Sequence, residues 1–285
     1  MIWKAACLPR STSEHGLQYV TVDQFKMILG KPRDDPDFLR AFVQLRAAEG
    51  DKPTRRNPSA YFWDAGLWTA CKESRDVIAG YLDIDNWKLV QARPSTEWTT
   101  ENFPMRLKSH DQNKELTTMV FPNRDIICIT SVIPYSMWDT VLRAFFLDNR
   151  KQSSVYKWNM AFAFDDSWII DMPGSDEEMW DECPVRGAIY TMVMEWLDLD
   201  TLRKNPPYFW LVVPNFHWVA QPGVDCETVY RTCNAEYLHI SWEALEATGF
   251  KPAVLKFIET LERISDESVD EGEVRQAIKL LVRKD

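Results

Sequence analysis

Aromatic side chains are the feature that most constrains how this chain of 285 residues can fold. It contains thirteen Trp, fourteen Phe and nine Tyr residues, and many of them stand close together in the sequence. Each ring carries a large apolar area that must be buried in a core or against a partner. The length is sufficient for a substantial core. We expect the Trp-rich segments 208–210 and 216–218 to be mostly core, with a minority of their rings lining a groove for a partner.

The charge and the cysteine pattern indicate an intracellular protein that does not bind polyanions. A formal net charge of −10 argues against binding to nucleic acid or to an anionic membrane through the field of the whole protein. The six cysteines include no C-x-x-C pair, which predicts buried free thiols in a reducing compartment, the cytoplasm or the nucleus. Residues 206–224 carry no formal charge, but four prolines interrupt them, so we predict a buried strand and a loop there.

The first 117 residues are predicted to contain few regular elements. β-Branched and aromatic residues favour a strand at 17–22. The stripe of Phe38, Phe42 and Leu45 after Asp35-Pro36 favours a helix, within an insertion near 31–60 that we expect to be mobile. A second helix is predicted at 65–79, with Gly80 as its C-terminal cap. Segment 83–117 is mostly polar.

From residue 118 onward, strand and helix patterns alternate. Strands are predicted at 118–121, 125–130, 157–164, 208–213 and 236–241, and helices at 137–148, 184–202 and 252–264. This order predicts a mixed α/β fold (α+β), with a mixed sheet flanked by helices and strand-helix-strand units loosely like leucine-rich-repeat turns. Residues 1–264 would form one domain. Residues 265–285 would form an amphipathic C-terminal helix packed on it, with basic residues near its end.

One of these strands shows the alternation of side chains most clearly. In segment 157–164, Trp158, Met160, Phe162 and Phe164 fall on one face, and the residues between them fall on the other. Because the second face consists of Asn159 and two alanines, we expect close packing on that side as well.

Two charged residues of the predicted helix 65–79 need partners outside that helix. Glu73 and Arg75 are two positions apart, which places them on nearly opposite faces, so they cannot pair with each other. A charge inside a core helix is costly unless it is paired. We therefore predict that at least one of the two forms a structural ion pair or hydrogen bond with an N-terminal helix near residues 2–8.

The order of several motifs resembles the fungal double-E-x-R family of uncharacterised proteins. The resemblance covers roughly residues 1–215, and the matching pieces are Ile2-Trp3-Lys4-Ala5-Ala6, the strand 17–22, Cys71-Lys72-Glu73-Ser74-Arg75, Phe121-Pro122-Asn123-Arg124-Asp125 and segment 158–168. The first E-x-R of the family is missing here. The resemblance implies a structural motif of Glu73, Arg75, Trp3 and Trp68, and it implies no established chemistry.

Other clusters of polar residues fit known sites poorly. The acidic stretch 165–182 could hold a divalent cation, but its spacing does not match an EF-hand loop, so a solvated loop is favoured. Cys226, Cys233 and His239 do not have the spacing of zinc ligands. Neither a G-x-S-x-G elbow nor a glycine-rich nucleotide loop occurs, and His217 between Phe216 and Trp218 fits a packed histidine. We therefore predict no catalytic, cofactor-binding or metal-ligating residue.

These observations lead to three hypotheses of function. The first is a non-catalytic intracellular module that binds a protein partner, without nucleic acid or membrane and with the oligomeric state left open. The second is an F-box-like substrate receptor of a ubiquitin ligase, because the family's usual opening resembles an F-box and Ile2-Trp3 is the part of it that remains here. The third is an enzyme with an unrecognised site, which a deep pocket with converging polar groups would favour.

Overall fold

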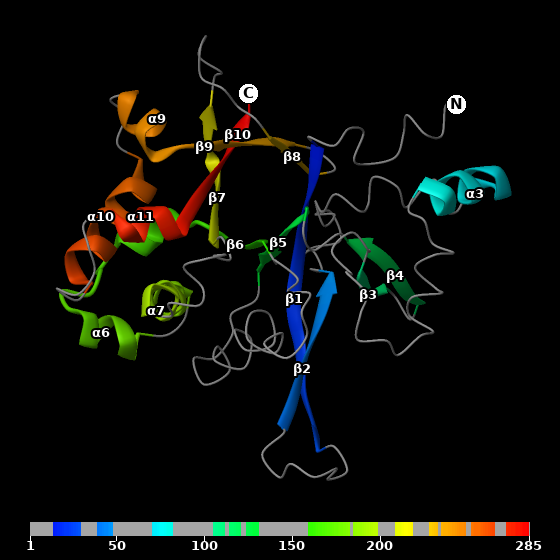
Figure 1. Cartoon of the computed structure of the whole chain (residues 1–285), viewed down its shortest axis with the longest axis horizontal. Coiled ribbons are helices and arrows are strands. Elements are labelled where there is room, and N and C mark those ends of the chain that lie inside the picture. The colour runs from blue at the N-terminus through cyan, green and yellow to red at the C-terminus, as the bar shows by residue number, and fades with distance from the viewer. Residues whose placement is uncertain are drawn as a thin grey trace.

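Seven strands close into a barrel, which forms the centre of the structure (Figure 1). The computed structural model describes residues 14–29, 39–47, 70–81, 105–111, 114–120, 124–130, 159–182, 185–198, 209–218, 228–232, 235–248, 252–265 and 272–284. Around the barrel the strands are β1 (Glu14–Leu29), β5 (Ile126–Ile129), β6 (Asn159–Ala163), β7 (Phe209–Trp218), β10 (Ile278–Lys284), β9 (Glu236–Ile240) and β8 (Val229–Arg231). Strand β8 pairs with β1 and completes the ring. All neighbours are parallel except the two pairs that contain β9.

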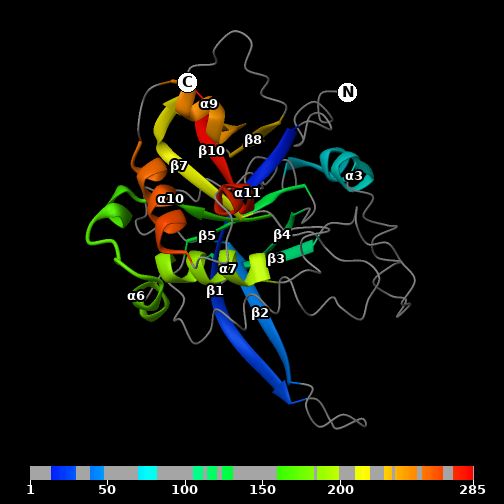
Figure 2. The same cartoon turned by 60° about the vertical axis from the view of Figure 1, so that its left-hand side comes forward.

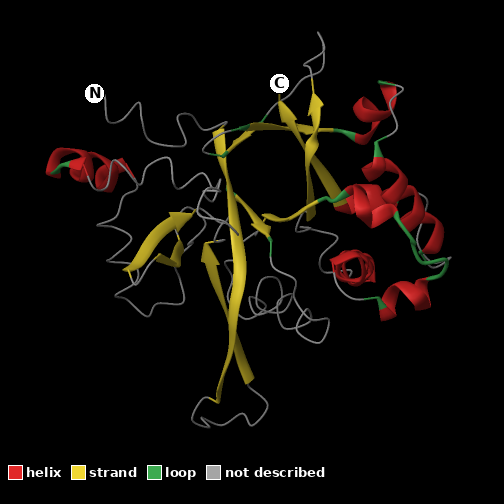
Figure 3. Cartoon of the chain, turned by 180° about the vertical axis from the view of Figure 1, so that it is seen from behind, coloured by secondary structure: helices red, strands yellow, loops and turns green. Residues whose placement is uncertain are grey.

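The predicted mixed sheet flanked by helices is therefore wrong, because the strands close into a barrel. Without the pairing of β1 with β8, the first residues of β1 and one side of β8 would have unpaired backbone groups, and closure satisfies those groups. The helices gather on one side of the ring of strands, except α3 (Lys72–Tyr81), which lies on the opposite side (Figure 3). No helix within the described ranges has the length and apolarity needed to cross a membrane.

Strand β1 continues beyond the barrel into a second part of the sheet. From Val20 on, β1 pairs antiparallel with β2 (Leu39–Ala47), with a bulge between Val22 and Gln24, and the two strands project as a long ribbon (Figure 1). Strands β3 (Met105–Asp111) and β4 (Lys114–Val120) form a hairpin beside β2. The helix predicted after Asp35-Pro36 is wrong where β2 lies. The apolar residues in 39–47 fit the period of two of a strand as well as the helical period, and a run this short cannot distinguish the two.

Side chains inside the barrel form a core of their own. Trp210 is 3% exposed and stands at its centre, with its ring 5.2 Å from that of Tyr230 and 5.1 Å from that of His239, measured between centroids. The remaining buried members are Leu17, Ile126, Cys128, Ala161, Val212, Tyr237 and Leu281. The inward face of β6 bears Ala161 and Ala163, which confirms the close packing predicted from the alternation in this strand.

The outward faces of the same strands pack against helices in a second core. Met160 and Phe162 of β6 face helix α7 (Val185–Asp198), α10 (Ala253–Ile264) and α11 (Glu273–Ala277), with α6 (Asp176–Asp181) and α9 (Trp242–Ala247) beside them (Figure 2). Both α7 and α10 begin and end close to the predicted positions. Their apolar stripes are long, and such stripes are the most dependable signal in a sequence.

The last segment of the chain differs most from its prediction. Helix α11 ends at Ala277, and the chain then forms β10 in the middle of the barrel wall, so the predicted C-terminal helix 265–285 is wrong from residue 278 on. Leu280 and Val282 face the helices while Leu281 faces the interior, so both faces of the strand are buried. Burial on both faces outweighs the distribution of charge that favoured a helix. Strand β7 likewise continues through Pro214 to Trp218, where a loop was predicted.

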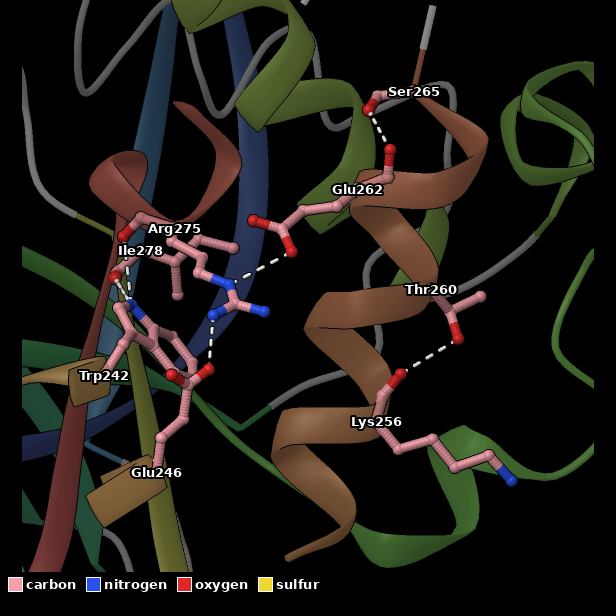
Figure 4. Close-up of polar contacts among 8 residues, drawn as sticks. All are labelled: Trp242, Glu246, Lys256, Thr260, Glu262, Ser265, Arg275 and Ile278. Carbon is pink, nitrogen blue, oxygen red and sulfur yellow. Dashed lines mark hydrogen bonds and ion pairs between the residues drawn. The ribbon is translucent and has the colours of Figure 1, made fainter. Parts of the chain in front are cut away.

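A single arginine connects three of the helices (Figure 4). In α11, Arg275 donates from Nε to Glu262 of α10 at 3.0 Å and from Nη1 to Glu246 of α9 at 2.5 Å. The indole of Trp242 donates to the backbone oxygens of Arg275 and Ile278 at 3.0 and 2.9 Å. These bonds fix the point at which α11 turns into β10.

The two carboxylates bound by Arg275 should differ in their contribution to stability. The side chain of Glu262 is 18% exposed and that of Glu246 is 45% exposed. We expect Glu262→Gln to lower the free energy of unfolding by about 1–3 kcal/mol, because a charge-assisted bond in a partly buried site is lost. Glu246→Gln should cost less than about 1 kcal/mol, since water screens that pair. Urea unfolding of both variants measures the difference, and equal losses would contradict the assignment.

Candidate functional site

The helix with the predicted structural motif presents its charged residues to solvent. Glu73 and Arg75 of α3 are both exposed, and the buried positions of this helix include Ser74 and Ile78. The predicted partner segment 2–8 lies outside the described residues, as do Trp3 and Trp68, so the ion pair with the N-terminal segment stays a prediction. Residues 65–69 of the predicted helix lie outside the described residues, and α3 continues past Gly80, which is not its cap.

The motif does contain a local structure that the sequence analysis missed. The backbone N–H of Ser74 donates to Cys71 Sγ at 3.4 Å, and the backbone N–H of Cys71 donates to Ser74 Oγ at 3.2 Å. This reciprocal pair is a capping box in which Cys stands at the N-cap and Ser three residues later. The C-x-x-S spacing could have indicated it. The cysteine and serine of this segment therefore cap the beginning of the helix.

A second element of the resemblance also has a structural role. Asp125, which is 4% exposed, accepts hydrogen bonds from the Gly16 backbone N–H and from Gln18 Nε2, both at 3.0 Å. Nearby, His15 Nδ1 donates to the backbone oxygen of Arg124 at 2.6 Å. These contacts attach the beginning of β5 to the beginning of β1. Ile2-Trp3, on which the F-box comparison rests, lies outside the described residues.

The acidic stretch 165–182 is more ordered than the predicted solvated loop. It contains the short helix η3 (Asp166–Ile169) and helix α6. Asp165 caps η3 by accepting from the backbone N–H of Ser167 at 2.8 Å, and Ser175 caps α6 by accepting from Glu178 at 3.3 Å. The exposed carboxylates are those of Asp165, Asp166, Asp171, Glu177, Glu178 and Asp181.

One apolar side chain stands out on this surface, which we call the Ile170 shelf and define as residues 165–182. Ile170 is 61% exposed, and it is the large apolar side chain that is most exposed among the described residues. Arg186 of α7 holds it in place by donating from Nη1 to the backbone oxygens of Trp168 and Ile170, each at 2.8 Å, and by pairing with Glu182. Asp171 follows with a φ of 50°, an uncommon conformation for a residue other than glycine.

The shelf is also attached to the core. The ring of Trp168 lies 5.2 Å from that of Phe164 and 5.6 Å from that of Phe257 in α10, between centroids. These contacts and the arginine bonds fix the backbone on both sides of Ile170. The exposed side chain therefore projects from a backbone that is held on both sides, in a stretch that carries several exposed carboxylates.

The interior of the barrel has the character of a dry core. Burial is the main cause of the pKa shifts of the interior side chains. It raises the pKa of Tyr19, Tyr230 and Tyr237, and it raises that of Cys128 to about 12. Every one of these shifts favours the neutral form, as expected where water is excluded.

The two basic groups beside Trp210 follow the same rule. Burial and the charge of Lys279 lower the pKa of His239 to about 4, and burial lowers the pKa of Lys279 itself. The ammonium of Lys279 lies 5.3 Å from the centre of the Trp210 ring, a cation–π distance. The nitrogen of that ring donates to Asn159 Oδ1 at 3.4 Å. Perturbed groups can mark catalysis, but here they line a packed interior.

The described residues contain no cluster of ligand side chains that supports the zinc hypothesis or the divalent-cation hypothesis. No set of three or more His, Cys, Asp or Glu side chains there is placed to hold a metal ion. Cys226 and Cys233 lie outside the described residues, and the ring of His239 packs against Trp210.

Comparisons with protein-family models, with curated proteins and with solved structures find no match to this chain. The resemblance to the double-E-x-R family consequently stays a prediction.

The buried histidine makes stability depend on pH. The pKa of His239 is about 4 in the folded chain and near 6.5 when unfolded, so the unfolded state takes up a proton first as the pH falls. The contribution of neutral His239 to stability is complete above pH 6.5 and is lost as the pH falls from 6.5 towards 4. After allowance for partial exposure, this loss is on the order of 1–2 kcal/mol.

A variant that cannot titrate at this position isolates the effect. We expect His239→Gln to lose less stability between pH 7 and pH 4.5 than the native chain, in urea unfolding at both pH values. Identical losses in the two proteins would show that His239 is not buried as described.

Proposed function

We propose that this chain is a non-catalytic protein-interaction module and that the Ile170 shelf is its contact surface. The observation that carries this proposal is a large apolar side chain, 61% exposed, whose backbone oxygen is held by Arg186, within a stretch that bears exposed carboxylates. Interfaces place an apolar anchor at the centre and polar groups at the rim, and a few anchors supply most of the binding energy.

Rigidity supports the proposal because it reduces the entropy lost on binding. Arg186 binds the carbonyl groups of Trp168 and Ile170, which restrains the backbone around the anchor before a partner arrives. Preorganised surfaces of this kind bind more tightly than mobile ones with the same contacts.

The charge on the shelf indicates what the partner must offer. The shelf carries six exposed carboxylates, and Arg186, which reaches it from α7, is bound to Glu182 and to the backbone. A partner with an apolar pocket bordered by Lys or Arg would complement both features.

A crosslinking experiment with a matched pair of variants tests the proposal. Ile170→Asp removes the anchor and adds one negative charge, and Gln276→Asp adds the same charge at an exposed position of α11. A photo-crosslinking residue at position 170 should capture a defined protein from the cells that express this chain, and the same residue at 276 should not. Loss of the anchor should weaken binding of that protein at least tenfold.

Two results would contradict the proposal. Equal binding of the captured protein by the Ile170→Asp and Gln276→Asp variants would place the contact elsewhere. Crosslinking at position 170 that does not exceed crosslinking at position 276 would mean that the shelf remains in solvent.

A further inference from the structure

The ribbon formed by the later parts of β1 and β2 has apolar residues on both of its faces. We call it the β1–β2 ribbon and define it as residues 24–29 and 39–44, which pair antiparallel in register. Alternate positions of a strand belong to opposite faces of the sheet. One face of the ribbon is therefore apolar throughout, and it consists of Phe25, Met27, Leu29, Leu39, Ala41 and Val43. A ribbon of two strands has no core of its own, so its apolar residues need a surface to pack against.

The other face of the ribbon combines apolar and basic residues, and we call it the mixed face. Lys26 is paired in register with Phe42, and Ile28 is paired with Arg40. Two cationic and two apolar residues thus alternate on this face. The ribbon contains no Asp or Glu, although the whole chain has a net charge of −10. It is therefore a basic element in an acidic protein.

The Ile170 shelf has the complementary features. Its sequence contains no Lys or Arg, six of its carboxylates are exposed, and Ile170 is 61% exposed. An apolar centre with complementary charges around it is the usual arrangement of a specific interface. On the mixed face of the ribbon, Ile28 and Phe42 match the isoleucine, and Lys26 and Arg40 match the carboxylates.

The ribbon and the shelf of one chain lie in different places. The far end of the ribbon extends past the barrel, and helix α6 of the shelf lies beside the other helices, away from that end (Figures 1 and 2). A contact between a ribbon and a shelf therefore joins two copies of the chain.

We propose that the partner of the Ile170 shelf is a second copy of this chain, which binds the shelf through the mixed face of its β1–β2 ribbon. This inference rests on the proposed function of the shelf as a contact surface. In a dimer with a two-fold axis the contact forms twice, because each copy supplies one ribbon and one shelf. Both surfaces are then occupied in both copies, so assembly stops at two.

Sedimentation velocity of the purified chain, from micromolar to millimolar concentration, tests this inference. We expect a reversible equilibrium between monomer and dimer that weakens as the salt concentration rises, since opposite charges hold the two surfaces together. Lys26→Glu combined with Arg40→Glu should raise the Kd of the dimer at least about tenfold, because it places like charges at the contact. Ile170→Asp, which removes the anchor, should also raise it at least about tenfold.

Crosslinking within the purified protein locates the contact. A photo-crosslinking residue is placed at position 170 of an isotopically labelled chain, which is then mixed with unlabelled chain. Crosslinked peptides that join a labelled to an unlabelled copy arise only between two molecules. We expect these peptides to connect position 170 of one copy with residues 24–29 or 39–44 of the other.

A matched pair of substitutions controls for a general effect of charge. Lys72→Glu combined with Arg75→Glu makes the same change in charge at exposed positions of α3 and should leave the Kd within about twofold of the native value. The near-ultraviolet circular dichroism spectrum of each variant verifies that it is folded.

Three results would overturn the inference. They are a chain that remains monomeric at millimolar concentration, an equal effect of the two double variants on the Kd, and crosslinks from position 170 to other parts of the second copy. The proposed function of the shelf is decided separately, by what position 170 captures in cells. Capture of a different protein there would support the shelf as a contact surface and would overturn the second copy as its partner.

Discussion

The parallel pairing of β1 with β8 is the constraint on which the rest of the structure depends. It joins the register positions of Glu14, His15 and Gly16 to those of Val229, Tyr230 and Arg231, which come from distant parts of the sequence. This pairing turns a sheet with two edges into a ring. Once the ring is closed, every strand in it has an inner and an outer face, and both faces must be filled.

The two faces are filled in different ways. The inner face carries large aromatic rings around Trp210 and small side chains on β6. The small side chains leave room for the large rings, so the interior is filled. The outer face takes the apolar stripes of α7 and α10. Burial drives the pKa of every shifted interior group towards its neutral form, as expected for a packed core.

The candidate for a functional surface therefore lies outside the packed core. On the outside of the barrel, Arg186 donates a hydrogen bond to the backbone oxygen of the exposed Ile170, in a stretch that carries several carboxylates. This arrangement holds an apolar side chain in a position that folding alone does not require, which supports its proposed role as a contact surface.

Local patterns in the sequence predicted some of these elements well. The alternation around Met160 and Phe162 identified β6 and both of its faces, and the long apolar stripe of α10 identified that helix. Short patterns were ambiguous: the apolar residues of 39–47 fit two periods, and only the tertiary pairing with β1 decides for a strand. Residues 278–284 were predicted to be helical because basic residues near the C-terminus suit a helix dipole, yet burial on both faces makes them a strand.

The features that matter most for function could not be predicted from local patterns. Closure of the barrel depends on two segments that are far apart in the sequence, and no periodicity reports such a contact. Ile170 belongs to an acidic stretch that the sequence suggests is a solvated loop, and its support comes from Arg186 in another helix. Arg40 was expected in a helix, and its place on one face with Lys26 follows only from the register of β1 and β2.

The most direct test of the central claim is a measurement of cross-strand contacts between β1 and β8. Amide–amide nuclear Overhauser effects in the perdeuterated chain report such contacts without any substitution. The closed barrel predicts effects between the amides of residues 14–16 and those of residues 229–231, with slow hydrogen exchange in both strands. Contacts of 229–231 with β9 alone, together with rapid exchange at residues 14–16, would show an open sheet and would contradict the account.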